Sequence, residues 1–544
     1  MGRRSAFKGP TAAALAGIVA LTAVLAPVAA AIAALVWRAQ DMPGVPLLSD
    51  PYLWSVARFT LLQAGLSALL SVGLAIPLSR ALARQQAFPG RGLVMRLFAL
   101  PLGLPALVAV LGIIEVWGRQ GIVNGGMVRL GLDRFDVYGL TGILLAHVFF
   151  NLPLAVRMLL ASLEAVPPET SRLAAQLGFR PRDTFRLIDW PVLKRALPAV
   201  FMLIFMLCAA SFTVVLTLGG GPGATTLEVA VYQALRFDFD PARAVLLALF
   251  QLVLCLVLQQ AVARLGAGTA LGMGVARTAA RPAAGASPSH GVRAAMDLGL
   301  IAIATVFVVT PMLAILLSGL AAPLAKLAQE PLVWRAIATS LATALAAALL
   351  AVTVTAALIA AQRDTGRLRA PPRWRRAFDA LAGSAASLTL AVPPVVLGAG
   401  WFVLTMPNSG EPAIAAGAVI VANALMALPF TFSILRPAVA EAAVAHDRLA
   451  LGLGITGIDR LRLIDIPALA RPMGLALAFA MAMSLGDLGV IALFGSDQFT
   501  TLPYLLYQRL GSYRSNDAAG LALILAALTL ALVWAAERFF GRRT

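Results

Sequence analysis

The sequence predicts an all-α polytopic membrane protein with about twelve transmembrane helices, arranged as two parallel six-helix repeats. Three observations predict it: a high apolar content, apolar runs long enough to span a bilayer, and motifs of the first half that recur in the second. Of the 544 residues, 60% are apolar and 12% are charged, whereas soluble domains carry roughly 25% charged residues. So few charges cannot cover the surface of a soluble protein of this size, which excludes the class of soluble enzymes.

The predicted spans follow from the length that a helix needs to cross a bilayer. About 20 apolar residues are enough, because a helix pairs its backbone polar groups within the segment. This criterion predicts twelve spans, near residues 11–36, 55–79, 93–117, 138–160, 197–217, 244–263, 294–319, 334–361, 380–405, 412–435, 472–494 and 518–536. The first span follows Arg3, Arg4 and Lys8, as in a signal peptide. Its apolar run is longer than the roughly 7–15 residues of a signal peptide, so we expect a retained helix.

The net charge of +18 is explained by membrane topology. With the N-terminus in the cytoplasm, most of the 43 Lys and Arg residues fall in cytoplasmic segments. This asymmetry predicts that both termini are cytoplasmic, and it requires no nucleic-acid partner. The two cysteines, Cys208 and Cys255, lie in separate apolar runs and indicate neither a disulfide framework nor a metal cluster. We therefore expect no metal site and no cofactor bound by this chain.

The two halves of the sequence repeat each other at an offset of 276 residues, so that Gly178 aligns with Gly454. Each repeat holds six spans, an even number, which gives both halves the same orientation in the membrane. We predict a first half at residues 1–265 and a second half at residues 294–544, each with six spans. Residues 266–293, rich in Ala, Gly, Ser and Pro, are expected to form a cytoplasmic linker.

The loop between the fourth and fifth spans of the first half carries helix start and stop signals. Pro168 begins a helical stretch, and Gly178 suits a left-handed residue just after its end. A second helix, about residues 182–190, is expected to end at Pro191, because proline breaks the backbone hydrogen-bond pattern.

The second half repeats this pattern. Gly454 ends one helix, Thr456 with Asp459 gives an N-cap signal, and Pro467 ends the next helix. We therefore expect two short amphipathic helices in each half, which form a docking element on the cytoplasmic face. The alternative is a helix pair that lies in the lipid headgroup layer.

A Gly followed thirteen residues later by a Pro, between the same two spans, resembles the loop that binds the ATPase in ABC importer permeases. In that family the triplet six residues before the Gly is typically Glu-Ala-Ala. Here the triplets begin with Arg172 and Arg448, so Arg replaces the Glu in both halves. The resemblance implies that a separate ATPase is contacted by the members of both loops: Arg172, Leu173, Ala174, Gly178, Pro191, Arg448, Leu449, Ala450, Gly454 and Pro467.

A wider set of motifs is similar to those of thiamine and thiamine-pyrophosphate ABC importer permeases. They are Tyr52-Leu53-Trp54, residues 146–153, Gln176-Leu177-Gly178, residues 218–222, Ala224-Thr225-Thr226, residues 240–244, Gly486-Asp487 and residues 511–515. The resemblance implies a type I ABC importer permease fold, the bacterial inner membrane, a periplasmic thiamine-binding protein and two copies of an ATPase subunit. The chain has no Gly-x-x-x-x-Gly-Lys-Ser/Thr loop, so we expect a transport subunit rather than an enzyme, with ATP and Mg²⁺ bound by the ATPase.

Polar and ionisable residues inside the spans are candidates for the substrate pathway, since they are costly in a bilayer. Asp487 is the clearest, and Ser211 aligns with it. A carboxylate here suits the cationic thiazolium ring of thiamine. The alternative is a Gly-flanked helix distortion, in which Asp487 binds freed backbone groups. His147 and Asn423 form a second aligned pair, and interhelical hydrogen bonding is the alternative for it.

Two other functions stay open at the level of the sequence. The same machine could carry ferric iron, although no pathway rich in carboxylates or Tyr is evident. A twelve-span secondary transporter would need no ATPase and would leave the repeated loop without a purpose. We therefore favour an ATP-driven importer that moves thiamine and thiamine phosphates into the cytoplasm.

Overall fold

The structure is a computed structural model in which residues 12–40, 50–219, 221–264, 291–366, 372–406, 411–455 and 457–541 are described. These segments consist of helices, turns and coil, with no strand in any of the described ranges, so the prediction of an all-α fold is confirmed. Within them, eleven helical segments are long and apolar enough to cross a membrane. Most of the predicted linker, and Thr456, lie outside the described residues.

The first half contains six long helices and several short ones between them. The long helices are α1 (Ala12–Gln40), α2 (Pro51–Arg84), α5 (Ala106–Trp117), α7 (Leu140–Glu164), α10 (Trp190–Ala209) and α13 (Pro241–Arg264). The short helices are α3 (Arg91–Leu97), α4 (Leu100–Gly103), α6 (Ile122–Arg129), α8 (Pro168–Gln176), α9 (Pro181–Thr184), α11 (Thr213–Leu218) and α12 (Leu227–Arg236).

The second half repeats the order of the main helices, with a short helix, α16, added between the first two. Its longer helices are α15 (Val292–Ala321), α17 (Pro331–Gly366), α18 (Arg373–Ala391), α19 (Pro394–Thr405), α20 (Pro412–Gly452), α22 (Ile466–Leu485) and α25 (Ser515–Gly541). Its short helices are α16 (Leu324–Gln329), α21 (Gly457–Arg460), α23 (Gly489–Phe494) and α24 (Leu502–Gly511).

The third predicted span of each half is not one continuous helix. The span predicted at 93–117 is divided among α3, α4 and α5, with Pro105 just before α5. The span predicted at 380–405 is divided into α18 and α19, and Pro393 lies between them. The prediction of unbroken helices is wrong at both places, because proline lacks the N–H that would continue the helical hydrogen bonding.

The fifth span of each half is interrupted at matching positions. In the first half α10 ends at Ala209 and α11 begins at Thr213, while in the second half α22 ends at Leu485 and α23 begins at Gly489. Ser211 and Asp487, the aligned pair of pathway candidates, lie in these two breaks. Both spans therefore expose backbone groups that other atoms must satisfy.

The first helix of each half packs against the other half. Helix α1 packs against α17 and α19, and α15 packs against α5. The indole Nε1 of Trp401 on α19 donates to the carbonyl of Pro27 on α1 over 2.9 Å. The backbones of α19 and α1 come close at Gly400, where a Cβ would lie 2.4 Å from the carbonyl oxygen of Ala31. The two halves are thus interlocked by an exchange of their first helices.

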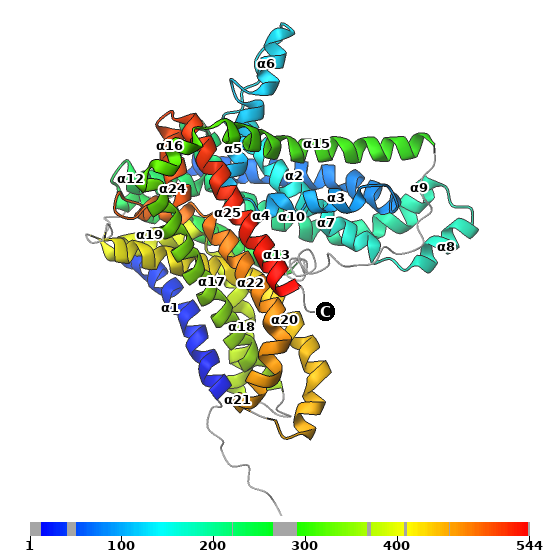
Figure 1. Cartoon of the computed structure of the whole chain (residues 1–544), viewed down its shortest axis with the longest axis vertical. Coiled ribbons are helices and arrows are strands. Elements are labelled where there is room, and N and C mark those ends of the chain that lie inside the picture. The colour runs from blue at the N-terminus through cyan, green and yellow to red at the C-terminus, as the bar shows by residue number, and fades with distance from the viewer. Residues whose placement is uncertain are drawn as a thin grey trace, which may run out of the picture.

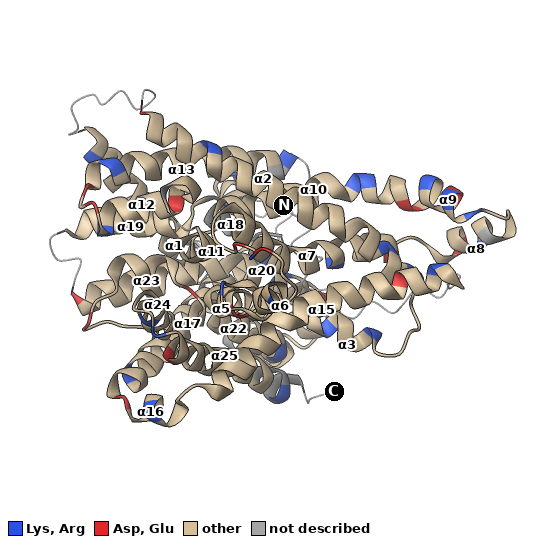
Figure 2. Ribbon diagram, turned by 90° about the horizontal axis from the view of Figure 1, so that it is seen from above, with Lys and Arg blue, Asp and Glu red and all other residues tan. Residues whose placement is uncertain are grey.

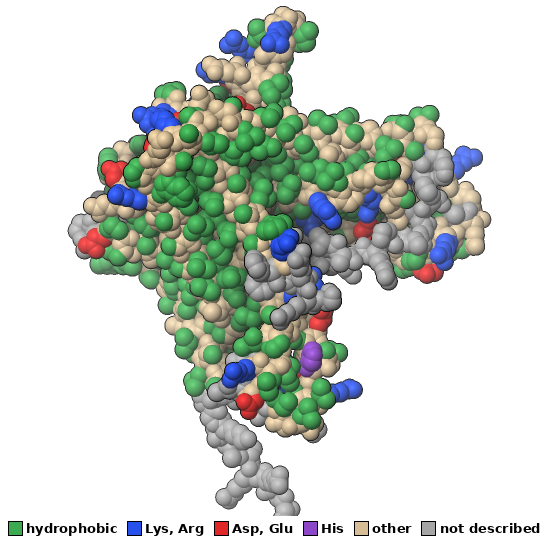
Figure 3. All heavy atoms as spheres, in the orientation of Figure 1, with side chains coloured by type: hydrophobic (Ala, Val, Ile, Leu, Met, Phe, Trp, Pro, Cys, Tyr) green, Lys and Arg blue, Asp and Glu red, His purple; other side chains and the backbone are tan. Residues whose placement is uncertain are grey.

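Figure 1 shows two arms that diverge from a common region. One arm ends at α8 and α9, and the other ends at α21. The halves meet near the opposite end, where α12 packs against α19 and α23 (Figure 1). Most charged residues gather near the ends of the helices, and the helix middles are mostly uncharged (Figure 2). Hydrophobic side chains cover the long sides of the helices (Figure 3), as a surface that contacts lipid requires.

Candidate docking loops and translocation pathway

The first helix ends in the same way in both docking loops. We call residues 168–191 the first docking loop and residues 444–467 the second docking loop. Gly178 has a φ of +67° and Gly454 a φ of +68°. The next residue in each loop donates its N–H back to an aligned alanine, Phe179 to Ala174 over 3.0 Å and Ile455 to Ala450 over 2.9 Å. This is the Schellman arrangement, which confirms the predicted left-handed glycine at both helix ends.

The predicted end of the second docking helix at proline is wrong. In the first half a π-helical turn at Phe185–Asp189 continues directly into α10, and Pro191 lies in the first turn of α10. The second half does the same, with a π-turn at Leu461–Asp465 and Pro467 in the first turn of α22. Proline is tolerated there because a first-turn residue needs no helical N–H partner.

The two loops differ in how they begin. In the first half α7 ends at Glu164 and α8 begins as a separate helix at Pro168. In the second half the corresponding helix is the end of the 41-residue α20, continuous with the tenth predicted span. The prediction of a separate short helix is therefore wrong for the second half. The physical reason is Pro167 and Pro168, which interrupt the first helix, whereas the aligned residues Ala443 and Val444 permit it to continue.

Both docking loops expose leucines at aligned positions. Their side chains are between 55% and 64% exposed in all six cases: Leu173, Leu177, Leu187, Leu449, Leu453 and Leu463. Among the other predicted contact residues Ala174 and Ala450 are buried, whereas the arginines, glycines and prolines are exposed. Exposed apolar side chains repeated on two surfaces are typical of an interaction site.

Ion pairs hold each docking loop to the transmembrane helices. In the first half Arg80 Nε on α2 lies 3.0 Å from Asp189 Oδ2, and its guanidinium lies 4.1 Å from the centre of the Phe185 ring. The first docking loop is therefore attached to α2 by a partly buried ion pair and a cation–π contact.

The second half has a larger network at the aligned aspartate. Arg363 on α17 and Arg460 on α21 each lie 3.3 Å from Asp465, and both also pair with Asp447. Burial lowers the pKa of Arg460, but Asp447 and Asp465 more than offset this and raise it above its ordinary value. Ion pairs of permanently charged arginines therefore attach the second docking loop to α17 and α20.

Three of the pathway candidates make hydrogen bonds between helices. His147 on α7 is 3% exposed, and its Nδ1 and Nε2 lie 2.9 Å from Ser67 Oγ and Ser211 Oγ. Asn423 Nδ2 on α20 donates to Ser484 Oγ on α22 over 2.8 Å. The structure therefore brings His147 and Ser211 together, and it holds Asn423 at the aligned place of the other half. This geometry agrees with the interhelical hydrogen bonding considered from the sequence.

Asp487 lies at the helix break of the second half. Its Oδ1 accepts a hydrogen bond from Gly489 N over 3.2 Å, which satisfies a free N–H at the start of α23. Its Oδ2 is buried and has no hydrogen-bond partner in the described part of the chain. None of the hydrogen bonds among the described residues joins it to the other three candidates.

A carboxyl group that the sequence analysis missed lies close to Asp487. Glu228 is 1% exposed, and neither of its carboxylate oxygens has a hydrogen-bond partner among the described residues. It lies in the first turn of α12, outside the candidate spans. Burial and the nearby Asp487 carboxyl raise the pKa of Glu228 well above its ordinary value. The sequence did contain a signal for this site, since Glu228 is an acidic residue within the mostly apolar stretch 227–235. The aligned residue of the second repeat is Pro503.

One face of α12 contacts the second half. Glu228, Tyr232 and Arg236 are four residues apart and so lie along one side of the helix. Arg236 Nη2 donates to the Gly495 carbonyl over 3.2 Å, and the hydroxyl group of Tyr232 interacts with that of its aligned residue, Tyr507. This face closes the end of the interface between the halves that is remote from the docking loops.

At the same end, each half carries an exposed aromatic residue in a strained conformation. Phe239 has a φ of +50° and is 81% exposed, and Tyr513 has a φ of +59° and is 96% exposed. No other described residue except glycine has a positive φ. Each precedes the last helix of its half, so the pair marks two equivalent places on this surface.

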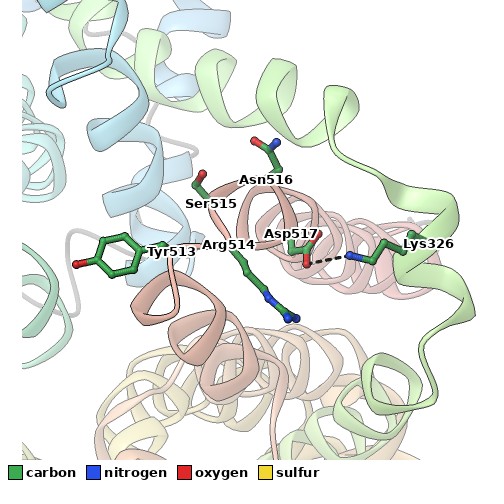
Figure 4. A pocket seen from close by; sticks show the side chains of 6 residues that line it. All are labelled: Lys326, Tyr513, Arg514, Ser515, Asn516 and Asp517. Carbon is green, nitrogen blue, oxygen red and sulfur yellow. Dashed lines mark ion pairs between the residues drawn. The ribbon is translucent and has the colours of Figure 1, made fainter.

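A surface pocket beside Tyr513 is separate from the pathway candidates. It has a volume of ≈ 260 Å³ and is lined by Lys326, Tyr513, Arg514, Ser515, Asn516 and Asp517. Figure 4 shows Lys326 reaching Asp517, and these two groups are 3.5 Å apart. Asp517 also lies 3.5 Å from Arg509, so the one acidic side chain of the pocket is already paired with two basic ones.

The fold and the paired loops define a membrane permease of a binding-protein-dependent transport system. Residues 75–270 match the family described as the binding-protein-dependent transport system inner membrane component.

Over nearly its whole length the chain is also similar to curated thiamine transport system permease proteins. It is 51% identical over 495 residues to the one from Brucella abortus (strain 2308), covering 91% of this chain and 89% of the relative. It is 46% identical over 528 residues to the one from Escherichia coli (strain K12), covering 97% and 96%. The chain belongs to this family, and its resemblance to ABC importer permeases is confirmed. The comparisons favour neither the ferric-iron permease nor the secondary transporter.

Proposed function

We propose that this chain is the permease through which thiamine and thiamine phosphates pass from a periplasmic binding protein into the cytoplasm. The observation that carries the proposal is the near full-length similarity to thiamine transport system permeases, which reaches 97% of this chain. The matched helix breaks and paired loops in both repeats support it, because a pathway between two similar halves needs both.

Two copies of a separate ATPase bind the two docking loops, and the ATPase holds ATP and Mg²⁺. The aligned exposed leucines support this, since two equivalent apolar surfaces suit two copies of one partner. Arg172 and Arg448 stand where the family has Glu, so these contacts need an acidic or neutral group on the ATPase. The loops and both termini face the cytoplasm, as the distribution of Lys and Arg indicates.

The opposite end of the molecule receives the loaded binding protein. Phe239 and Tyr513 support this role, because they place one exposed aromatic side chain on each half. Large aromatic side chains are common anchors in protein interfaces. A partner that spans both residues would contact both halves at once.

The transport cycle follows from the way in which the loops are attached. When two ATPase subunits close around ATP, they draw the docking loops together. The ion pairs at Asp189 and Asp465 pass this movement to α2 and α17. The arms then close at the docking-loop end and open at the end near α12. ATP binding shifts this equilibrium only because the ATPase pair binds ATP more tightly in the closed state.

The pathway runs between the halves, past the breaks in their fifth spans. His147, Ser211 and Asn423 hold the helices around these breaks by hydrogen bonds. Asp487 provides a negative charge at the interface, which suits a cationic substrate. The division of the chain into halves depends on the criterion. The repeats divide it at the linker (266–293) into halves at 1–265 and 294–544. Judged by packing contacts, however, α1 belongs with the second half and α15 with the first.

The function is tested by reconstitution of the permease with its binding protein and ATPase in proteoliposomes. Uptake and ATP hydrolysis are measured with thiamine, thiamine pyrophosphate and ferric iron. We expect ATP-dependent uptake of the two thiamine compounds and none of iron. Stimulation by iron alone would refute the substrate, and uptake by the permease without ATP would refute the importer mechanism.

The docking assignment is tested separately by replacing Leu173 and Leu449 with Ser. Both side chains are exposed, so the permease should remain folded while the ATPase no longer co-purifies with it. The matched control replaces Leu130, another exposed leucine (77%) outside the docking loops, with Ser. Equal ATPase recovery with all variants would contradict the assignment.

A further inference from the structure

Most carboxyl groups in the interior of the protein are paired with arginine. The ion pairs are Arg80–Asp189, Arg84–Asp297, Arg91–Glu164, Arg363–Asp465, Arg509–Glu330 and Arg509–Asp517. Glu228 and Asp487 differ, since no ion pair among the described residues reaches either of them. A buried carboxylate without a cation is unfavourable, which raises the pKa of Glu228, and a bound cation would favour its charged form.

These two carboxyl groups come from different halves and lie near the same part of the interface between them. Helix α12, which carries Glu228 in its first turn, packs against α19 and α23 of the second half. Asp487 lies where these two helices begin, because a Cβ on Gly489 would be 3.4 Å from both Asp487 Oδ1 and Pro394 Cβ. The Asp487 carboxyl is close enough to Glu228 to act on it electrostatically. Asp487 is partly exposed, although its Oδ2 is buried, and Glu228 is 1% exposed.

Aromatic rings lie on the same side of α12. Tyr232 follows Glu228 by one helical turn, and the ring of Phe212 packs against Tyr232 edge to face at 5.4 Å. Tyr507 approaches from the second half. Carboxylates together with aromatic faces are a favourable environment for an organic cation.

A metal ion fits the same residues less well. No group of three or more His, Cys, Asp or Glu residues that could hold a metal ion occurs among the described residues. Two carboxylates alone leave most of the coordination positions of a divalent cation without protein ligands. A cation with delocalised charge and a flat ring needs fewer polar contacts.

We propose that Glu228 and Asp487 form a binding site for the organic cation of the transported molecule, at the interface between the halves. The inference rests on the proposed function, in which the thiazolium ring supplies this permanent positive charge. Because each half contributes one carboxyl group, movement of the halves changes the distance between them. The site is therefore assembled in one state of the cycle and separated in another, which lets the cation enter and leave.

The test compares thiamine with a neutral analogue in which thiophene replaces the thiazolium ring. Glu228→Gln and Asp487→Asn are reconstituted with the binding protein and ATPase, and uptake of both compounds is measured with saturated binding protein. Affinities of the binding protein for both compounds are measured independently. Glu115→Gln, a partly buried carboxyl on α5, is the matched control.

Loss of one charged contact should lower thiamine uptake about tenfold or more in Glu228→Gln and in Asp487→Asn. Uptake of the neutral analogue should stay within about twofold of the wild type, and the control should transport both compounds normally. Equal losses for both compounds would show a structural role and overturn the proposal, as would unchanged thiamine uptake. If the wild type itself imports no thiamine, the proposed function fails, and this inference fails with it.

Discussion

Replacing Gly178 and Gly454 with Ala tests whether the docking loops need their left-handed turns. A Cβ at either position would meet no atom within 4 Å, so Ala introduces no steric clash. The cost is only that of the left-handed backbone, about 1–2 kcal/mol at each residue. This lowers the population of the docking geometry by a factor of about 5–30 for each loop. Because the glycines lie in separate loops, their effects should add as free energies.

The assay measures the affinity of the purified ATPase for the permease in lipid nanodiscs. Each single Ala variant should weaken binding about 5- to 30-fold, and ATP-driven uptake should fall in parallel. Asn at the same positions is the control, because its short polar side chain tolerates the left-handed region. The Asn variants should bind within about threefold of the wild type.

Two results would refute this reasoning. Equal loss with Ala and Asn would show that the glycines matter for a reason other than their positive φ. Unchanged ATPase affinity in the double Ala variant would show that the turns at Gly178 and Gly454 do not shape the docking surface.

Three further substitutions test other parts of the structure. Gly400→Ala forces α19 away from α1 and should lower the free energy of unfolding by about 1–3 kcal/mol, measured by thermal unfolding, whereas the control Gly417→Ala, at a position with open space, should not. Equal melting temperatures of the two variants would contradict the close contact. Arg80→Gln removes the ion pair between α2 and the first docking loop, which lowers stability by about 1 kcal/mol, and it should leave ATPase binding intact but reduce substrate uptake per ATP hydrolysed. An unchanged ratio of uptake to ATP hydrolysis would refute the role of this ion pair. Tyr513→Gly relieves about 1 kcal/mol or more of backbone strain and should still weaken stimulation by the binding protein several-fold; full stimulation would exclude an interfacial role.

The sequence was sufficient for the class of fold and for the repeat, because apolar length and recurring motifs are local properties of the chain. It also predicted the conformation of Gly178, since a glycine after a helix has a specific backbone role. The effect of proline was harder to predict. Pro105 interrupts its helix, whereas Pro191 lies in the first turn of a continuing helix. The difference depends on which turn holds the proline and not on its presence alone.

The interface between the halves could not be derived from the sequence. Glu228 lies in an apolar stretch that is typical of an ordinary helix, and nothing in its spacing indicates that it lies near Asp487. Contacts between α12 and α23 are made by residues more than 250 positions apart. They depend on how the two repeats are placed together, which periodicity within one helix does not report.

The exchange of first helices has a consequence for how the protein is assembled in the membrane. Helix α1 is synthesised first, but its packing partners α17 and α19 belong to the second half. During insertion α1 must therefore remain in lipid, with its contact surface at Gly17 and Ala31 unpaired, until most of the chain has been made. Helix α15 waits for only part of its packing, because α5 is already in place when it emerges, whereas its other main partner, α25, is made last. Covalent fusion of the halves keeps both partners at equal number and within reach, which makes this order of assembly efficient.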